Sequence, residues 1–365
     1  MNLLVIEDEP GFVKRLQLAF APDGSSNKLL TPESVGLLKD EMTEGESFEA
    51  QFLSRLRNIH ERENIDLVLL DTDLSRFKGI PISQTLCRQA LQEIGIPVCR
   101  YKKSYSSTTS NRLRDLKRIA REGASAVWTP PELVKQEELG DLVPWLLAVE
   151  QGFRQIRERL QSDPSILEKP LGPAGVLARV LRAPKLRADL LGYTTQNLFF
   201  FAAPINEDDD DSLPPVQVLA TRLGYWLFNY VLTFPGPILP TAAAAALFNL
   251  DTPSFLNEKV QEIVAPARYS GPFDAVDTYY WREEMNDLLD TSDGDPLGSE
   301  QFSALKLKRV DEENPALHAY YCVLSGKPIA LAETANPSPD WIPPGADITR
   351  ISEDLLESLD PMLSM

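Results

Sequence analysis

Three acidic residues of this chain could do chemistry together, because two apolar stretches each end on carboxylates. The apolar run 3–6 is followed by Glu7 and Asp8, and the run 65–70 is followed by Asp71. If the fold brings these side chains together, their charges repel one another unless a cation or protons compensate. A hard divalent cation such as Mg²⁺ suits an oxygen cluster of this kind. One carboxylate could then attack a phosphoryl group while the metal neutralises the phosphoryl oxygens.

The elements that must position these acids follow from the pattern of residues 1–135, where short apolar runs alternate with amphipathic stretches. The pattern predicts strands at 2–7, 65–70, 96–101 and 125–128, a weaker strand near 28–31, and helices at 11–20, 47–62, 81–93 and 110–122. This alternation predicts an α/β fold with a doubly wound, parallel, five-stranded sheet. The carboxyl ends of its strands share one edge, where ligand sites gather, so Glu7, Asp8 and Asp71 should meet there.

Several motifs in this order resemble the receiver domain of bacterial response regulators, which has a flavodoxin-like fold. The matching stretches are LLVIEDEP, DLVLLDTDL, Gly79 eight positions after Asp71, IPVCRYK as the fourth strand, and GASAVWTPP as the fifth strand with its loop. The resemblance covers residues 1–135. It implies that Glu7, Asp8 and Asp71 form a Mg²⁺ site and that Asp71 accepts a phosphoryl group from a cognate kinase or another phosphodonor.

Two positions depart from the receiver pattern. The family usually has Thr or Ser at the end of the fourth strand, where this chain has Lys102, and it usually has Lys where this chain has Pro130. Thr108, in a longer loop, could supply the missing hydroxyl. Pro130 has neither a charge nor an N–H group, so we expect Lys102 or Lys103 to reach the acids as a substitute cation. Whether Asp71 is phosphorylated or belongs to a pseudo-receiver stays open.

Composition and charge narrow the class of protein. The chain of 365 residues carries a net charge of −18, of which residues 1–165 contribute −3 and residues 166–365 contribute −15. An acidic second half repels nucleic-acid backbones at long range. No apolar run is long enough to cross a membrane. Three cysteines without metal-ligand spacing, and no secretory leader, predict a cytoplasmic protein with reduced thiols.

The remaining sequence predicts a helical linker at 136–165 and a mixed α+β output or interaction domain at 166–365. The linker has an apolar stripe and could pair with a second copy, giving a homodimer, or could pack only on its own chain. Pro144 fits the first turn of its helix. The segment 240–264 has the outline of a helix-turn-helix, with Asp251 and Thr252 as cap residues. We expect a winged-helix-like unit that contacts protein.

Three functions remain compatible with the sequence. The first is a response-regulator-like signalling protein, not an enzyme, that acts through protein contacts of its C-terminal half. The second is a transcriptional regulator whose segment 240–264 reads DNA, although that segment offers few basic side chains. The third is an enzyme in the second half that the receiver controls, and a deep pocket with converging polar groups in residues 176–365 would favour it.

Overall fold

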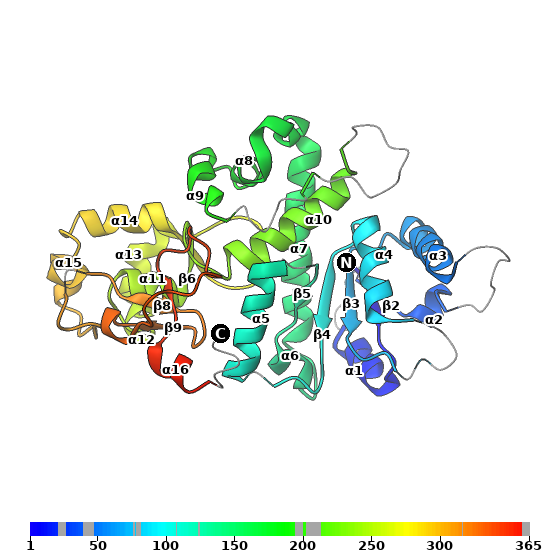
Figure 1. Cartoon of the computed structure of the whole chain (residues 1–365), viewed down its shortest axis with the longest axis horizontal. Coiled ribbons are helices and arrows are strands. Elements are labelled where there is room, and N and C mark those ends of the chain that lie inside the picture. Colours follow the sequence, from blue (N-terminus) through cyan, green and yellow to red (C-terminus); the bar gives the residue numbers. More distant parts are fainter. Residues whose placement is uncertain are drawn as a thin grey trace. The chain divides into compact units, whose positions relative to one another are not determined.

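The structure, a computed structural model, describes residues 1–359 except 21–26, 39–46, 76, 78–81, 107, 123–124, 194–199, 202–212 and 316. Gly79 therefore lies outside the described residues. The chain forms two compact units, each built from segments that are separated in sequence (Figure 1). The first unit comprises Met1–Ser106, Ala124–Ser165 and Phe199–Tyr225, and the second comprises Ser107–Gly123, Ile166–Leu198 and Trp226–Met365. The boundaries expected at 135 and 165 stay a prediction.

The first unit contains the five-stranded, all-parallel sheet that the sequence predicts, in the order β2-β1-β3-β4-β5. Its strands are β1 (Asn2–Ile6), β2 (Lys28–Leu30), β3 (Leu67–Asp71), β4 (Val98–Tyr101) and β5 (Val127–Trp128). The helices of this unit before β5 are α1 (Pro10–Phe20), α2 (Pro32–Val35), α3 (Phe48–Glu63) and α4 (Gln84–Ile94). After β5 come α6 (Pro131–Lys135) and α7 (Leu142–Ser162). The architecture of this unit is thus α/β, consistent with a flavodoxin-like fold.

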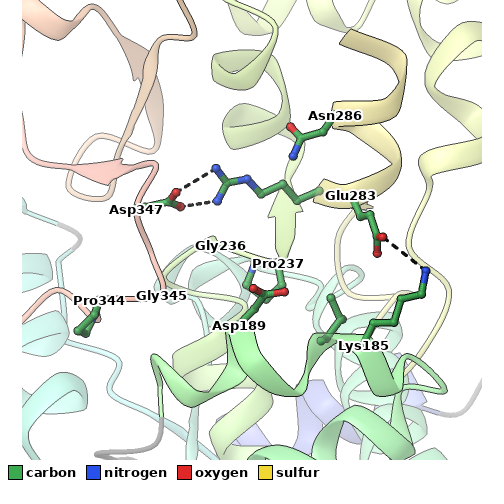
Figure 2. Close-up of a pocket in the computed structure, with 11 residues that line it drawn as sticks. Lys185, Asp189, Gly236, Pro237, Glu283, Asn286, Pro344, Gly345 and Asp347 are labelled. Atoms are coloured by element: carbon green, nitrogen blue, oxygen red, sulfur yellow. Dashed lines mark hydrogen bonds and ion pairs between the residues drawn. The ribbon is translucent and has the colours of Figure 1, made fainter. Parts of the chain in front are cut away.

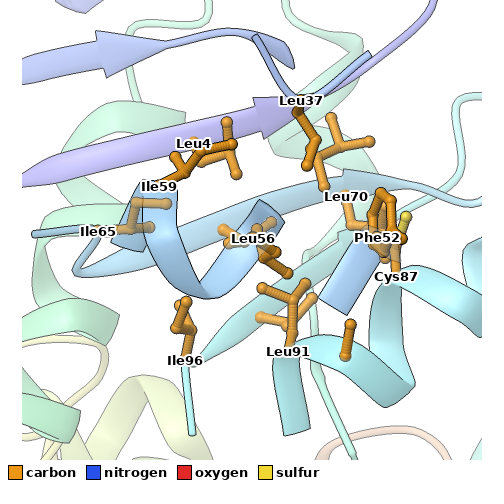
Figure 3. Close-up of a cluster of buried hydrophobic side chains, with 14 of the residues drawn as sticks. Leu4, Leu37, Phe52, Leu56, Ile59, Ile65, Leu70, Cys87, Leu91 and Ile96 are labelled. Carbon is orange, nitrogen blue, oxygen red and sulfur yellow. The ribbon is translucent and has the colours of Figure 1, made fainter. Parts of the chain in front are cut away.

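The central strands are buried on both faces, which is why they consist almost entirely of Leu, Val and Ile. Leu4 and Leu70 point into a cluster with Phe52 and Leu56 of α3 and Leu91 of α4 (Figure 3). Successive side chains of a strand point to opposite faces. The alternate residues Leu3, Val5, Leu67 and Leu69 therefore face the other side of the sheet, and they too are fully buried.

Helix α7 packs within the first unit. Val143, Leu146, Val149, Phe153 and Ile156 of its apolar stripe are all buried, and Pro144 lies in its first turn as the sequence predicts. An interior position would have cost this proline a backbone hydrogen bond. The stripe is thus covered by the helix's own chain, which is one of the two alternatives left open for the linker.

The first unit also includes most of a helix from the second half of the sequence, α10 (Val216–Trp226). Its residues up to Tyr225 belong to this unit. The buried Tyr225 hydroxyl accepts a hydrogen bond from the Val98 N–H of β4 at 2.8 Å, and the Thr221 hydroxyl donates to the Gly95 carbonyl at 2.6 Å. Gly95 lies so close that a Cβ there would be 2.7 Å from the Val218 nitrogen. Helix α10 therefore satisfies the backbone at the amino end of β4.

The second unit combines helices with two small sheets. Its helices are α5 (Thr109–Glu122), α8 (Gly172–Val180), α9 (Arg187–Leu191), α11 (Thr241–Leu247), α12 (Thr252–Phe255), α13 (Glu258–Val264), α14 (Arg282–Asp290), α15 (Glu300–Ser303) and α16 (Glu353–Glu357). Leu227–Val231 forms a π-helix. Antiparallel β6 (Ile238–Pro240) and β7 (Tyr279–Trp281) make one sheet, and β8 (Tyr320–Cys322), β9 (Lys327–Ile329) and β10 (Thr349–Arg350) make the other, in the order β10-β8-β9.

The helix-turn-helix outline of segment 240–264 is only partly found. Asp251 caps α12 as predicted, because its side chain accepts the Ser254 N–H at 2.8 Å. The helix ends at Phe255, however, and a separate helix starts at Glu258 with Asn257 as its cap. The side chain of Asn257 accepts the Lys259 N–H and so favours a new start over continuation. Within the described part of the chain, no helix combines the length and apolarity needed to span a bilayer.

Candidate functional site

The sheet brings Glu7, Asp8 and Asp71 together. Strands β1 and β3 are parallel neighbours with Ile6 opposite Leu70, so the residues that follow both strands leave the sheet at the same edge. One carboxylate oxygen from each acid lies within 4.8 Å of the others. Glu7 is 4% exposed and Asp71 is 3% exposed. The expected convergence is therefore present, and two of the three carboxylates have lost nearly all contact with solvent.

The cation that faces these acids belongs to Lys103. Its Nζ atom lies 2.8 Å from Glu7 Oε1, 2.8 Å from Glu9 Oε2 and 3.5 Å from Asp71 Oδ2. The same ammonium group lies 5.1 Å from the ring centre of Phe12, which adds a cation–π contact. One lysine thus contacts three carboxylates, and its charge compensates part of the repulsion among them.

Tyr101, the last residue of β4, also contacts the acid cluster. Its fully buried hydroxyl donates to Glu7 Oε2, and its ring stacks on Phe12 with centroids 5.0 Å apart. Tyr101 and Lys103 thus both bond to Glu7, one from the end of β4 and the other from the turn that follows it. Tyr101 is a site residue that the motif comparison missed; a hydroxyl-bearing aromatic at a buried strand end was its only sequence signal.

Backbone N–H groups also donate hydrogen bonds to the carboxylates of Glu7 and Asp71. The Glu9 N–H donates to Glu7 Oε1 at 2.7 Å, and the Asp73 N–H donates to Asp71 Oδ1 at 3.0 Å. Both oxygens of Glu7 therefore already accept hydrogen bonds from protein donors. Asp71 has one oxygen turned to a backbone N–H and the other toward Lys103.

The burial of this site changes its acid–base behaviour. Burial raises the pKa of Glu7 above its ordinary value, and the nearby Asp71 charge adds to this, although the bonds from Lys103 and Tyr101 oppose it. Burial also raises the pKa of Asp71 against the opposing bond from Asp73 and the charge of Lys103. Burial alone would lower the pKa of Lys103, but its bonds to Glu7 and Glu9 bring the net pKa above the ordinary value. The lysine stays charged while the two carboxyls hold protons more tightly than usual.

The remaining predicted site residues are Lys102 and Thr108. Lys102 is exposed, and its side chain forms no ion pair with a described residue. Its neighbour Lys103 therefore takes the substitute-cation role that was expected of one of the two. Thr108 belongs to the second unit, where its hydroxyl accepts the Asn111 N–H at 3.2 Å and caps the start of α5. Pro130 precedes α6 at its N-cap position.

Whether the acid cluster can bind Mg²⁺ depends on which of its carboxylate oxygens are already engaged. Three carboxylates supply the hard oxygen ligands that this ion prefers. The oxygens of Glu7 are engaged by Lys103, Tyr101 and the Glu9 N–H, so an ion at this site would have to bind mainly through the Asp71 carboxylate. Any ion there would have to share the Asp71 carboxylate with Lys103. The residues fit a divalent cation only if Lys103 gives way.

Comparison of the chain with protein-family models, with curated proteins and with solved structures finds no significant match.

Proposed function

We propose that this chain is a response-regulator-like signalling protein whose first unit is a pseudo-receiver. In this proposal the Lys103 ammonium group takes the place of the metal ion that phosphoryl transfer to Asp71 would need, and the C-terminal half acts through protein contacts. The supporting observation is the position of the Lys103 Nζ atom, which is within 4 Å of carboxylate oxygens from Glu7, Glu9 and Asp71.

The geometry disfavours phosphoryl transfer for a physical reason. A carboxylate nucleophile needs an accessible oxygen and a cation that neutralises the incoming phosphoryl oxygens. Asp71 is 3% exposed, and its oxygens face the Asp73 N–H and Lys103. Burial also raises its pKa above the ordinary value. Because its own lysine already occupies this site, the first unit would keep a single conformation.

The alternative of a DNA-reading segment at 240–264 receives less support. The hydroxyl of Ser254 accepts the Lys308 N–H at 2.9 Å, and the amide of Gln261 donates to the Phe255 carbonyl at 2.8 Å. The same amide accepts the Tyr280 hydroxyl at 2.7 Å. Side chains that hold the protein's own backbone and core cannot also read base edges without breaking those bonds.

The proposal is tested with Mg²⁺ and beryllofluoride, a mimic of the phosphoryl group. Wild type, Asp71→Asn and Lys103→Met are compared by melting temperature and by association state. A pseudo-receiver predicts that beryllofluoride leaves wild type unchanged. A shift that occurs in wild type and disappears in Asp71→Asn would show a working phospho-acceptor and overturn the proposal. Salt-dependent binding of duplex DNA by the full chain would instead favour the alternative.

A further inference from the structure

A pocket opens in the second unit. It has a volume of about 510 Å³ and lies between α9, the start of α14 and the loop that contains Pro344 and Gly345 (Figure 2). Volumes of this order hold small organic ligands. All of its lining residues belong to the second unit.

Part of the pocket wall is formed by two glycines, Gly236 and Gly345, that have no room for a Cβ atom. A Cβ on Gly236 would lie 2.2 Å from the Gly345 carbonyl oxygen and 2.2 Å from the Tyr193 hydroxyl. A Cβ on Gly345 would lie 2.4 Å from the ring of Tyr193. Tyr193 is fully buried and donates to the Phe234 carbonyl at 2.8 Å. The wall is therefore closely packed and formed in advance of any ligand, which lowers the entropic cost of binding.

One pair of charges in the pocket is already satisfied. Arg282, at the start of α14, forms a two-pronged ion pair with Asp347, and its Nη2 atom lies 3.0 Å from Asp347 Oδ2 (Figure 2). A bidentate pair of this kind fixes the guanidinium plane. Arg282 and Asp347 therefore shape the pocket and neutralise each other.

Three other charges remain open to a ligand. Lys185 Nζ lies 3.8 Å from Glu283 Oε1, and their side chains are 85% and 58% exposed, so this pair is loose and easily exchanged. Asp189 is exposed, and among the described residues its carboxylate has no hydrogen-bond or ion-pair partner. Lys185 and Asp189 are four positions apart on neighbouring helical turns and line the same pocket. The pocket lining thus offers one exchangeable cation, Lys185, and two anions, Asp189 and Glu283.

The lining favours binding over covalent catalysis. Among the described residues that form it there is no serine, threonine, cysteine or histidine. It therefore lacks the hydroxyl and thiol nucleophiles and the histidine base that many enzyme sites use.

We propose that this pocket binds a small zwitterion that carries a primary ammonium and a carboxylate, as free amino acids and short peptides do. The ammonium lies at Asp189 and the carboxylate at Lys185, which leaves Glu283. The Asn286 amide, which also lines the pocket, offers a further polar contact. A ligand with only one of the two charges satisfies only one side of the site.

The test is calorimetric titration of the full chain with a panel of free amino acids and dipeptides. Each is compared with the amine that lacks its carboxylate and the acid that lacks its ammonium. At least one zwitterion should bind saturably, and each analogue should bind about tenfold or more weakly, because it loses a charge-assisted hydrogen bond. Free amino acids and dipeptides are separate arms, so the panel also identifies the source. Absence of saturable binding throughout, or an analogue that binds as tightly as its parent, would overturn the proposal.

Matched variants locate the binding. Asp189→Asn and Lys185→Met should each weaken binding by about tenfold. The controls are Asp287→Asn on α14 and Arg187→Met on α9, which change exposed charges outside the pocket and should leave the affinity unchanged. Unchanged affinity in Asp189→Asn or Lys185→Met would place the ligand elsewhere and refute the assignment.

Discussion

The ammonium group of Lys103 lies 2.8 Å from Oε1 of Glu7, although the two residues are 96 positions apart in the chain. Glu7 follows β1, and Lys103 follows β4, which is not a neighbour of β1 in the sheet. The contact therefore ties two separated strand ends to each other across the end of β3. It makes the acid cluster a structural element of the first unit as well as a candidate site.

Removal of this lysine should destabilise the protein. Lys103→Met leaves the buried carboxyls of Glu7 and Asp71 without their cation, at an expected cost of roughly 1–3 kcal/mol. The cost stays below that of a fully buried ion pair because the Lys103 side chain is 30% exposed. Urea denaturation measures the change. Lys102→Met, one residue away and exposed, is the control and should change stability by less than about 0.5 kcal/mol; equal losses in both variants would contradict the assignment of the cation.

The Tyr101 hydroxyl should matter separately from its ring. Tyr101→Phe keeps the stack on Phe12 but removes the bond to Glu7 Oε2. We expect a loss of about 1–3 kcal/mol, because a buried carboxylate oxygen is left without its donor. In the double variant with Glu7→Gln the two effects should not add. Additive losses would mean that the hydroxyl does not act through Glu7.

The stability of the folded protein should change with pH in the direction that a raised carboxyl pKa requires. Because the folded protein holds the Glu7 proton more tightly than the unfolded chain, this contribution to stability is full below about pH 4.5 and is lost as the pH rises through the raised pKa. The stability of wild type relative to Glu7→Gln should therefore fall from pH 4.5 toward neutrality. Carboxyl NMR should show Glu7 titrating above 4.5, whereas Glu63, whose pKa is lowered by its bond from Lys28, titrates below it. A Glu7 titration below 4.5 would contradict the burial of this site.

The packing of α10 on the first unit can be tested at Gly95. This residue has φ +83°, and an added Cβ would lie 2.7 Å from the Val218 backbone nitrogen. Gly172 also has a positive φ, +63°, but has open space around its Cβ position. Gly172→Ala should therefore cost only the backbone strain of about 1–2 kcal/mol. Gly95→Ala should cost clearly more in the same denaturation experiment, and equal costs would mean that α10 does not pack there.

Much of the first unit could be predicted because local pattern and global topology agree there. The runs that became β1, β3 and β4 are short and rich in Leu, Val and Ile, and parallel connections then force Glu7 and Asp71 to one edge. The choice between Lys102 and Lys103 was harder. It is decided in the turn that follows β4, where the Lys103 side chain contacts the acids.

The second half was less predictable because composition shows that a segment is buried without showing what buries it. Thr221 and Tyr225 lie within the segment 166–365 that the sequence predicts as a second domain, yet their polar atoms bond to Gly95 and Val98 of the first unit. Likewise, the break between α12 and α13 depends on Asn257 acting as a cap rather than continuing a helix. Such choices are decided by tertiary contacts, which periodicity does not encode.

The measurement that tests the central claim most directly is calorimetric titration with Mg²⁺ of wild type, Lys103→Met and Lys102→Met. If Lys103 serves as the site's built-in cation, its removal should strengthen Mg²⁺ binding by about tenfold or more, since the ion no longer competes with an ammonium group for Asp71. Lys102→Met should bind like wild type. Equal Mg²⁺ affinity in wild type and Lys103→Met would contradict the account.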